Sequence, residues 1–209
     1  MASTNISIES TESAPSPGAW GLQKIAGVSA LIEGAIYASA IVYFLLVLDF
    51  PSVTGAAEMV ELLVANETSI YVMNLLAYVV FGILLVVLVL ALHQRLQSGS
   101  PALMQTATIF GLIWAGLVIA SGMIANVGTA AVVGLYGTDP SQAATVWMGI
   151  SPVIEGLGGG NEIVGGLWTL LVSLAALRAG LLHRALNYLG LVVGGAGILS
   201  AIPALGEIG

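Results

Sequence analysis

Long apolar stretches recur along this chain, and they constrain its fold more than any other feature. A helix needs roughly 20 apolar residues to cross a bilayer at about 1.5 Å per residue. A soluble fold and a disordered chain are both excluded, because 58% of the residues are hydrophobic and only 7% are charged. We therefore expect an all-α, polytopic transmembrane helix bundle. The predicted spans are at about residues 25–48, 70–92, 104–127, 163–177 and 185–205.

Two segments outside the first spans have different patterns. Residues 1–19 are rich in Ser, Thr and Pro and have no basic segment ahead of an apolar run. They predict a disordered tail rather than a signal peptide, with residues 20–209 as a single transmembrane domain. Residues 53–69 place apolar side chains on one helical face and Glu58, Glu61 and Glu67 on another. That pattern predicts an interfacial helix on the outer side of the membrane.

The stretch from Asp139 to Gly180 allows either one crossing or two. Asp139 followed by Pro140 is typical of a helix start, with Asp as the N-cap and Pro at the first helical position. The next residues gather their apolar side chains on one face, and the glycines at 158–160 then interrupt the pattern. We expect a second outer interfacial or re-entrant helix here, followed by the short span at 163–177.

The positions of the charged residues decide between one crossing and two in this stretch. With one crossing in that stretch, Lys24, Arg95, Arg178 and Arg184 all lie on one side of the membrane. Because cytoplasmic loops collect Lys and Arg, we expect five spans in a plasma membrane, with the N-terminus cytoplasmic and the C-terminus outside. Six spans is the alternative, and it would move two of the arginines outside. The acidic residues expected on the outer side are Asp49, Glu58, Glu61, Glu67, Asp139, Glu155, Glu162 and Glu207.

The composition also narrows the class of partner. The chain has 4 basic and 11 acidic residues, which argues against a nucleic acid, because phosphate contacts need clustered Lys and Arg. It has no cysteine, which excludes disulfides and thiolate metal ligands. His93 and His183 both lie at the inner ends of spans, so we expect interfacial side chains rather than haem ligands. We expect the lipid bilayer as partner and no metal or cofactor.

Small residues four apart predict close packing between helices. Such spacing suits packing within one chain and association between copies, and we expect mainly the former. The residues with this spacing are Ala30, Gly34 and Ala38 in the first span, Gly111 and Ala115 in the third, and Gly190 and Gly194 in the last.

Two short segments carry a resemblance to a known family. They are Lys24-Ile25-Ala26-Gly27, after the polar tail, and the nine residues LHRALNYLG from Leu182 to Gly190. In these segments and in its length the chain resembles a family of small multi-pass prokaryotic membrane proteins, a domain of unknown function of the 4386 type. The resemblance extends from about Lys24 onward and implies a helical membrane fold. It implies no activity and no functional residue.

Glu33 is the only charged residue inside the predicted spans. An ionised carboxylate within a membrane helix costs of the order of 2.5–3.5 kcal/mol on insertion scales. One interpretation is a relay for protons or cations. The other is a neutral glutamic acid hydrogen-bonded to a neighbouring helix through Asn74 or Ser121.

The second candidate site flanks the glycine break. Interrupted hydrophobic segments can mark ligand sites in transporters, and Glu155, Asn161 and Glu162 could supply oxygen ligands to a cation. The alternative is a flexible outer connection with a solvated helix cap, since Glu favours helix N-termini.

The sequence favours a non-enzymatic structural or accessory subunit that acts through helix contacts in a homo-oligomer or a larger membrane complex. No phosphate loop, zinc-protease pair or nucleophile elbow occurs. The alternative is a small proton- or cation-linked transporter or channel that uses Glu33.

Overall fold

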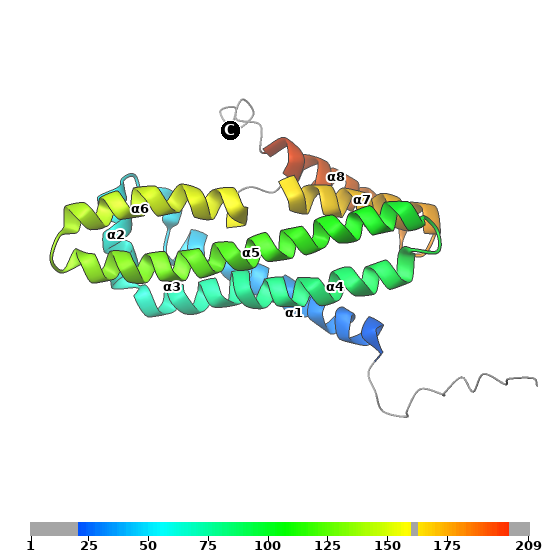
Figure 1. Ribbon diagram of the computed structural model, residues 1–209, viewed down its shortest axis with the longest axis horizontal. Coiled ribbons are helices and arrows are strands. Elements are labelled where there is room, and N and C mark those ends of the chain that lie inside the picture. The colour runs from blue at the N-terminus through cyan, green and yellow to red at the C-terminus, as the bar shows by residue number, and fades with distance from the viewer. Residues whose placement is uncertain (1–20, 160–162, 201–209) are drawn as a thin grey trace, which may run out of the picture.

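The computed structural model describes residues 21–159 and 163–200, and all regular structure in these residues is helical (Figure 1). The α-helices are α1 (Leu22–Val42), α2 (Ala56–Ala65), α3 (Glu67–Asn74), α4 (Phe81–Leu96), α5 (Pro101–Tyr136), α6 (Pro140–Ile154), α7 (Ile163–Ala179) and α8 (Arg184–Ser200). The segments between them include three π-helical stretches and one 3₁₀ turn. These are η1 (Tyr43–Val47), η3 (Leu75–Val80), η4 (Glu155–Gly159) and the 3₁₀ turn η2 (Phe50–Ser52).

Four helical stretches are long and apolar enough to cross a membrane. They are Leu22–Val47, Glu67–Leu96, Pro101–Tyr136 and Pro140–Ala179, and the last includes residues 160–162, which the structure does not describe. Helix α8 has 17 residues up to Ser200, where the described part ends. The chain is therefore an all-helical integral membrane protein, as predicted. The exact number of spans and the side on which each end lies stay predictions.

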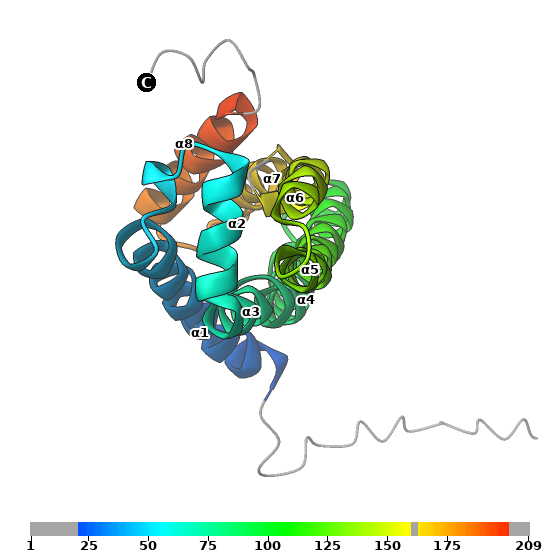
Figure 2. The same ribbon diagram turned by 90° about the vertical axis from the view of Figure 1, so that its left-hand side faces the viewer.

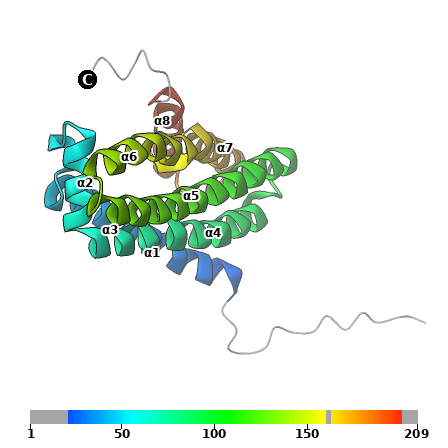
Figure 3. The same cartoon turned by 60° about the vertical axis from the view of Figure 1, so that its left-hand side comes forward.

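Helix α5 is the central element of the bundle. At about 1.5 Å per residue its 36 residues extend for about 54 Å. Helix α4 packs antiparallel along one side of α5, and α6 and α7 follow one another along another side (Figure 3). Helix α1 packs against α4 and α8 packs against α7, so α1 and α8 lie at the two ends of an open arc (Figures 1 and 2).

The charged residues separate between the two ends of the bundle. Lys24 lies near the start of α1, Arg95 and Arg178 near the ends of α4 and α7, and Arg184 at the start of α8 (Figure 1). We call this the basic end. At the opposite, acidic end, α2 crosses the bundle between the other helices (Figure 2). The acidic residues at this end are Asp49, Glu58, Glu61, Glu67 and Asp139.

The region after α5 begins as the sequence predicts. The Asp139 carboxylate accepts a hydrogen bond from the backbone N–H of Gln142 at 2.9 Å, and Pro140 is the first helical residue. This N-cap satisfies one of the free N–H groups of the first turn. Helix α6 then runs alongside α5 with Ala143 and Ile154 buried, and the helix breaks at Gly158, whose φ is 149°. Because α6 and α7 run in the same direction, this arrangement is consistent with one crossing between Asp139 and Arg178.

The segment after α1 is divided differently from the prediction of one helix over residues 53–69. Helix α2 ends at Ala65, and Asn66 serves as the cap between α2 and α3. Helix α3 starts at Glu67 and continues through η3 into α4, so this helical stretch begins three residues before the predicted span. The turn before α2 places Asp49 in the left-handed region with a φ of 49°, a conformation that Asp adopts more readily than most residues.

Two clusters of buried apolar side chains form the core. The first, which we call the packed region, lies between α4, α5 and α7 toward the basic end and includes Leu85, Ala115 and Trp168. The second lies at the acidic end between α2, α3, α5 and α6 and includes Leu63 and Ile70.

Candidate functional site

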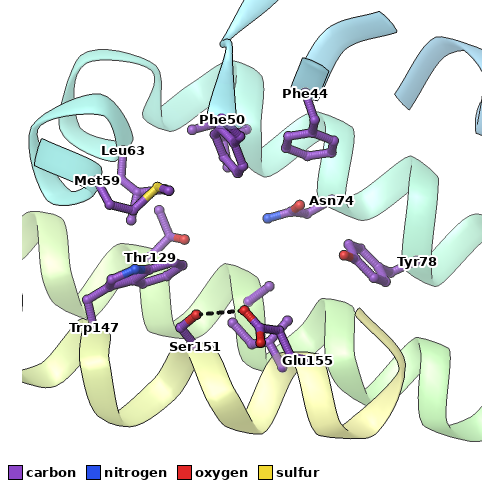
Figure 4. Close-up of a pocket in the computed structure, with 13 residues that line it drawn as sticks. Phe44, Phe50, Met59, Leu63, Asn74, Tyr78, Thr129, Trp147, Ser151 and Glu155 are labelled. Atoms are coloured by element: carbon purple, nitrogen blue, oxygen red, sulfur yellow. Dashed lines mark hydrogen bonds between the residues drawn. The ribbon is translucent and has the colours of Figure 1, made fainter. Parts of the chain in front are cut away.

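A partly enclosed cavity of about 340 Å³ opens beside the second core cluster (Figure 4). Its walls come from the segments that follow α1 and from α2, α3, α5 and α6, so residues far apart in the sequence meet there. Most of the lining is apolar or aromatic, and a few polar groups face the same space. The lining residues are Phe44, Phe50, Met59, Leu63, Ile70, Asn74, Tyr78, Ala125, Thr129, Trp147, Ser151, Ile154 and Glu155.

Each of the three π-helical segments in the described residues contributes to this wall. Phe44 belongs to η1, Tyr78 to η3 and Glu155 to η4. A π-helical turn inserts an extra residue into the helix, and such turns are frequent at functional sites. The cause of η4 is visible in the sequence. Pro152 has no backbone N–H to donate within α6, and Gly158 adopts a φ that side chains disfavour.

Asn74 and Glu155, two of the candidates from the sequence, lie on opposite walls of the cavity. Asn74 is only 5% exposed, and its amide points into the cavity from the end of α3 (Figure 4). The Glu155 carboxylate accepts a hydrogen bond from the Ser151 hydroxyl at 3.3 Å. That bond is the only one drawn between lining residues in Figure 4. The Asn74 amide faces the same space from the opposite wall.

Two hydrogen bonds from α5 fix the walls around the cavity. The buried Ser121 hydroxyl donates to the carbonyl oxygen of Ile154 at 2.8 Å, immediately before η4. The Asn126 amide donates to the carbonyl oxygen of Tyr71 at 3.3 Å and holds α3 against α5. The hydroxyl proton of Ser121, one of the two partners suggested for Glu33, is thus donated to α6. The Oδ1 atom of Asn126 is buried and has no hydrogen-bond partner among the described residues.

Glu33 lies apart from this cavity. It is 6% exposed on α1, and its Oε1 atom has no hydrogen-bond partner within the described part of the chain. It lines neither this cavity nor the more open hollow between α2 and α6 that adjoins it. Of the two acidic candidates from the sequence that the structure describes, Glu155 lines the cavity and Glu33 does not. Asn161 and Glu162 lie outside the described residues.

The small residues chosen from the sequence fall into two groups. A Cβ atom at Gly111 would come within 2.6 Å of Trp168 and Val89, and one at Gly194 would lie 2.6 Å from the carbonyl oxygen of Gly166. These glycines allow close helix packing within the chain, and Ala115 and Gly190 are also in such contacts. By contrast, Gly34 and Ala38 are exposed on α1, Ala30 is half-buried, and nothing lies within 4 Å of a Cβ atom at Gly34.

Most of the residues that line the cavity were not predicted from the sequence. Five of them come from four different elements, and no short motif connects the four: Phe44 from η1, Phe50 from η2, Thr129 from α5, and Trp147 and Ser151 from α6. The available signal is an enrichment of aromatic residues around the acidic end, which also fits interfacial anchoring. The lining contains no Lys, Arg or His.

The two histidines lie in the other half of the molecule. His93 is hydrogen-bonded to the Thr108 hydroxyl at 2.8 Å, and the His183 ring accepts from the backbone N–H of Ala185. These local contacts account for both side chains. No group of three or more His, Cys, Asp or Glu residues suited to a metal occurs in residues 21–159 and 163–200.

A second, more open hollow of about 350 Å³ adjoins the cavity between α2 and α6. Both hollows are lined by Met59, Trp147 and Ser151. These three side chains therefore form part of the wall of both hollows.

Comparison with known proteins gives one match. A family model described as "Domain of unknown function (DUF4386)" matches residues 24–206. No curated protein and no solved structure matches the chain.

Proposed function

Because the chain belongs to the DUF4386 family, a domain of unknown function, we propose its role from the cavity: it is a membrane protein that binds a small, largely apolar molecule between α2, α3, α5 and α6. The observation that carries this proposal is the cavity itself. Ligand sites are typically hollows of about 300–1,000 Å³ with apolar and aromatic walls and a few placed polar groups. A cavity of about 340 Å³ with Asn74 as a buried, inward-pointing amide has this character.

Binding is a better account of the cavity than catalysis. A catalytic serine needs a base that takes its proton, and histidine is the usual one. Ser151 is the serine in the lining, and its hydroxyl donates to Glu155 in a long hydrogen bond of 3.3 Å. None of the lining residues is a His, Lys or Cys. The proposed role is therefore non-enzymatic, as the sequence favours.

The test uses the fact that the chain contains no cysteine. Thr129→Cys places a unique thiol in the cavity, and Thr106→Cys places one on an exposed position of the same helix α5. In full-length protein in lipid nanodiscs, we expect neopentylbenzene to slow the reaction of Thr129→Cys with a small methanethiosulfonate reagent. The reaction of Thr106→Cys should not change.

Equal rates for Thr129→Cys with and without neopentylbenzene, up to its solubility, would overturn the binding proposal. The filled-cavity variant Ala125→Phe, combined with Thr129→Cys, provides the matched control. Its thiol should react slowly without any added compound, because the phenyl ring occupies the space beside it.

Transport through Glu33 is the second candidate function. One observation favours it: the Oε1 atom of Glu33 is buried without a hydrogen-bond partner among the described residues, and such intramembrane carboxyls commonly mark ion pathways. A flux assay in proteoliposomes that compares Glu33→Gln with the parent protein tests it. Equal proton and cation flux would remove Glu33 from any mechanism.

The accessory role through helix contacts stays a prediction. The exposed positions Gly34 and Ala38 on α1 are available to a neighbouring helix of another copy or of another protein. This role is compatible with ligand binding, because α1 presents these residues away from the cavity.

A further inference from the structure

The charge of the cavity restricts what it can hold. Among the described residues that line the cavity, Glu155 is the only one with a charged side chain. An anion would lie beside this carboxylate with no positive group to compensate it. A purely apolar ligand would add no partner to the carboxylate, which accepts one hydrogen bond from Ser151, or to the Asn74 amide. Polar groups that lose water without gaining a partner make binding weaker. A cationic ligand satisfies both groups.

The aromatic side chains point to an organic cation rather than a bare metal ion. Phe44, Phe50, Tyr78 and Trp147 surround the space from three sides (Figure 4). The face of an aromatic ring carries negative potential and attracts ammonium groups, and cages of such rings bind quaternary ammonium ions. Hard metal cations instead require several oxygen ligands, and most of this lining is apolar.

The charged residues around the cavity are negative, like Glu155. Asp49 directly precedes Phe50, and Glu58 and Glu61 lie on α2, which also contributes Met59 and Leu63 to the wall. The four basic residues of the chain are gathered at the basic end of the bundle. A cleft in a field of one sign raises the local concentration of ligands of opposite charge.

Resting on the proposed binding function, we propose that the cavity is a site for a small organic cation: a protonated or quaternary amine with an apolar body. The ammonium group lies between Glu155 and the aromatic rings. The Asn74 amide oxygen accepts a hydrogen bond where the amine carries an N–H, and the apolar body of the ligand packs against Met59, Leu63 and Ile154.

The test compares two probes of the same shape. Benzyltrimethylammonium carries a positive nitrogen where neopentylbenzene carries a neutral carbon. We expect the cation to protect Thr129→Cys from the methanethiosulfonate reagent at a concentration about tenfold lower than the neutral probe needs. A preference of this size is expected because one carboxylate and a few ring faces attract the positive charge. In Glu155→Gln this preference should fall toward onefold, whereas Glu61→Gln, an acidic position outside the lining, should retain it.

A second variant separates the rings from the carboxylate. Phe44→Leu keeps an apolar wall but removes a ring face, and it should lower the preference for the cation while protection by neopentylbenzene persists. If both probes protect at equal concentration in the parent protein, the cation proposal is wrong and the binding function stands. If neither probe protects, the binding function itself fails. If Glu61→Gln and Glu155→Gln lose the preference equally, the attraction comes from the general acidic field and the assignment to Glu155 is overturned.

Discussion

The packed region near the basic end and the cavity region near the acidic end are built from the same long helices with opposite results. In the packed region, glycines let helices touch: a Cβ atom at Gly111 on α5 would come within 2.6 Å of Trp168 on α7. In the cavity region, three π-helical segments interrupt the helices and a space of about 340 Å³ remains.

The difference lies in how each region satisfies its polar groups. In the packed region, side chains such as His93 and Thr169 bond to nearby partners, at 2.8 Å in each case. Around the cavity, the Oδ1 atom of Asn126 is buried and has no partner among the described residues. Unsatisfied polar groups in a membrane protein are costly, and they are retained mainly where they serve a function. The comparison supports the proposed binding site in the cavity region, while the unpartnered Oε1 atom of Glu33 supports the second candidate function on α1.

The largest expected effect concerns the two ends themselves. A cysteine replacing the exposed Ala57 at the acidic end should react with a membrane-impermeant maleimide in intact cells. One replacing the exposed Leu181 at the basic end should react only after permeabilisation, because Lys and Arg accumulate on the cytoplasmic side. Labelling of Leu181→Cys in intact cells would refute the five-span orientation.

The contact between α7 and α8, beside the packed region, should be the most sensitive point of the helix packing. Gly166→Leu forces a side chain against the backbone of Gly194 and should lower the free energy of unfolding in mixed micelles by about 3 kcal/mol. Gly195→Leu, where no atom lies within 4 Å of a Cβ position, should change it little. Similar losses in the two variants would mean that α8 does not pack as described.

A pair of alanines on α5 compares the two regions directly. Ala115 is fully buried in the packed region, and Ala115→Leu should cost about 1–3 kcal/mol through overpacking. Ala125 lines the cavity, so Ala125→Leu has room for the added carbons and should change the unfolding free energy by less than about 0.5 kcal/mol. If both variants lose the same stability, there is no cavity beside Ala125.

The smallest predicted effect concerns the wall of the cavity. Ser121→Ala removes the hydrogen bond to the carbonyl oxygen of Ile154 and should cost about 0.5–1 kcal/mol, the usual value for a bond between membrane helices. Thr145→Ala, which removes a bond within α6 at an exposed position, is the control and should cost less. A Ser121→Ala variant as stable as the control would show that the bond does not hold α6 to α5.

Much of the fold follows from the sequence, because the length of each apolar run and the residues at its ends determine where a helix begins and ends. The apolar runs predict the long helices, Asp139 predicts the start of α6, and the glycines after Leu157 predict its break. Helix α5 extends to Tyr136, nine residues beyond the predicted end of its span, because residues 128–136 contain no charge, proline or cap that would stop a helix. The thickness of the membrane sets how many residues lie within the bilayer, but a helix can continue beyond it.

The site was predictable only in part. Asn74 and Glu155 stood out as polar residues in or beside apolar segments, and both line the cavity. The π-helical segments and the approach of Phe44 to Trp147 depend on tertiary packing, for which a single sequence carries no periodic signal. Glu33 stood out for the same reason as Glu155, yet it lies away from the cavity, because polarity alone does not say which face of a bundle is hollow.

The acidic half of the molecule contains the cavity and the basic half is packed, and α5 passes through both. The most direct test is the rate at which Thr129→Cys and Ala107→Cys, two buried positions on α5, react with a small methanethiosulfonate reagent in the ligand-free protein. Since thiol reactivity follows access, we expect the cavity cysteine to react at least about tenfold faster than the one in the packed region. Equal, slow rates at the two positions would contradict the account.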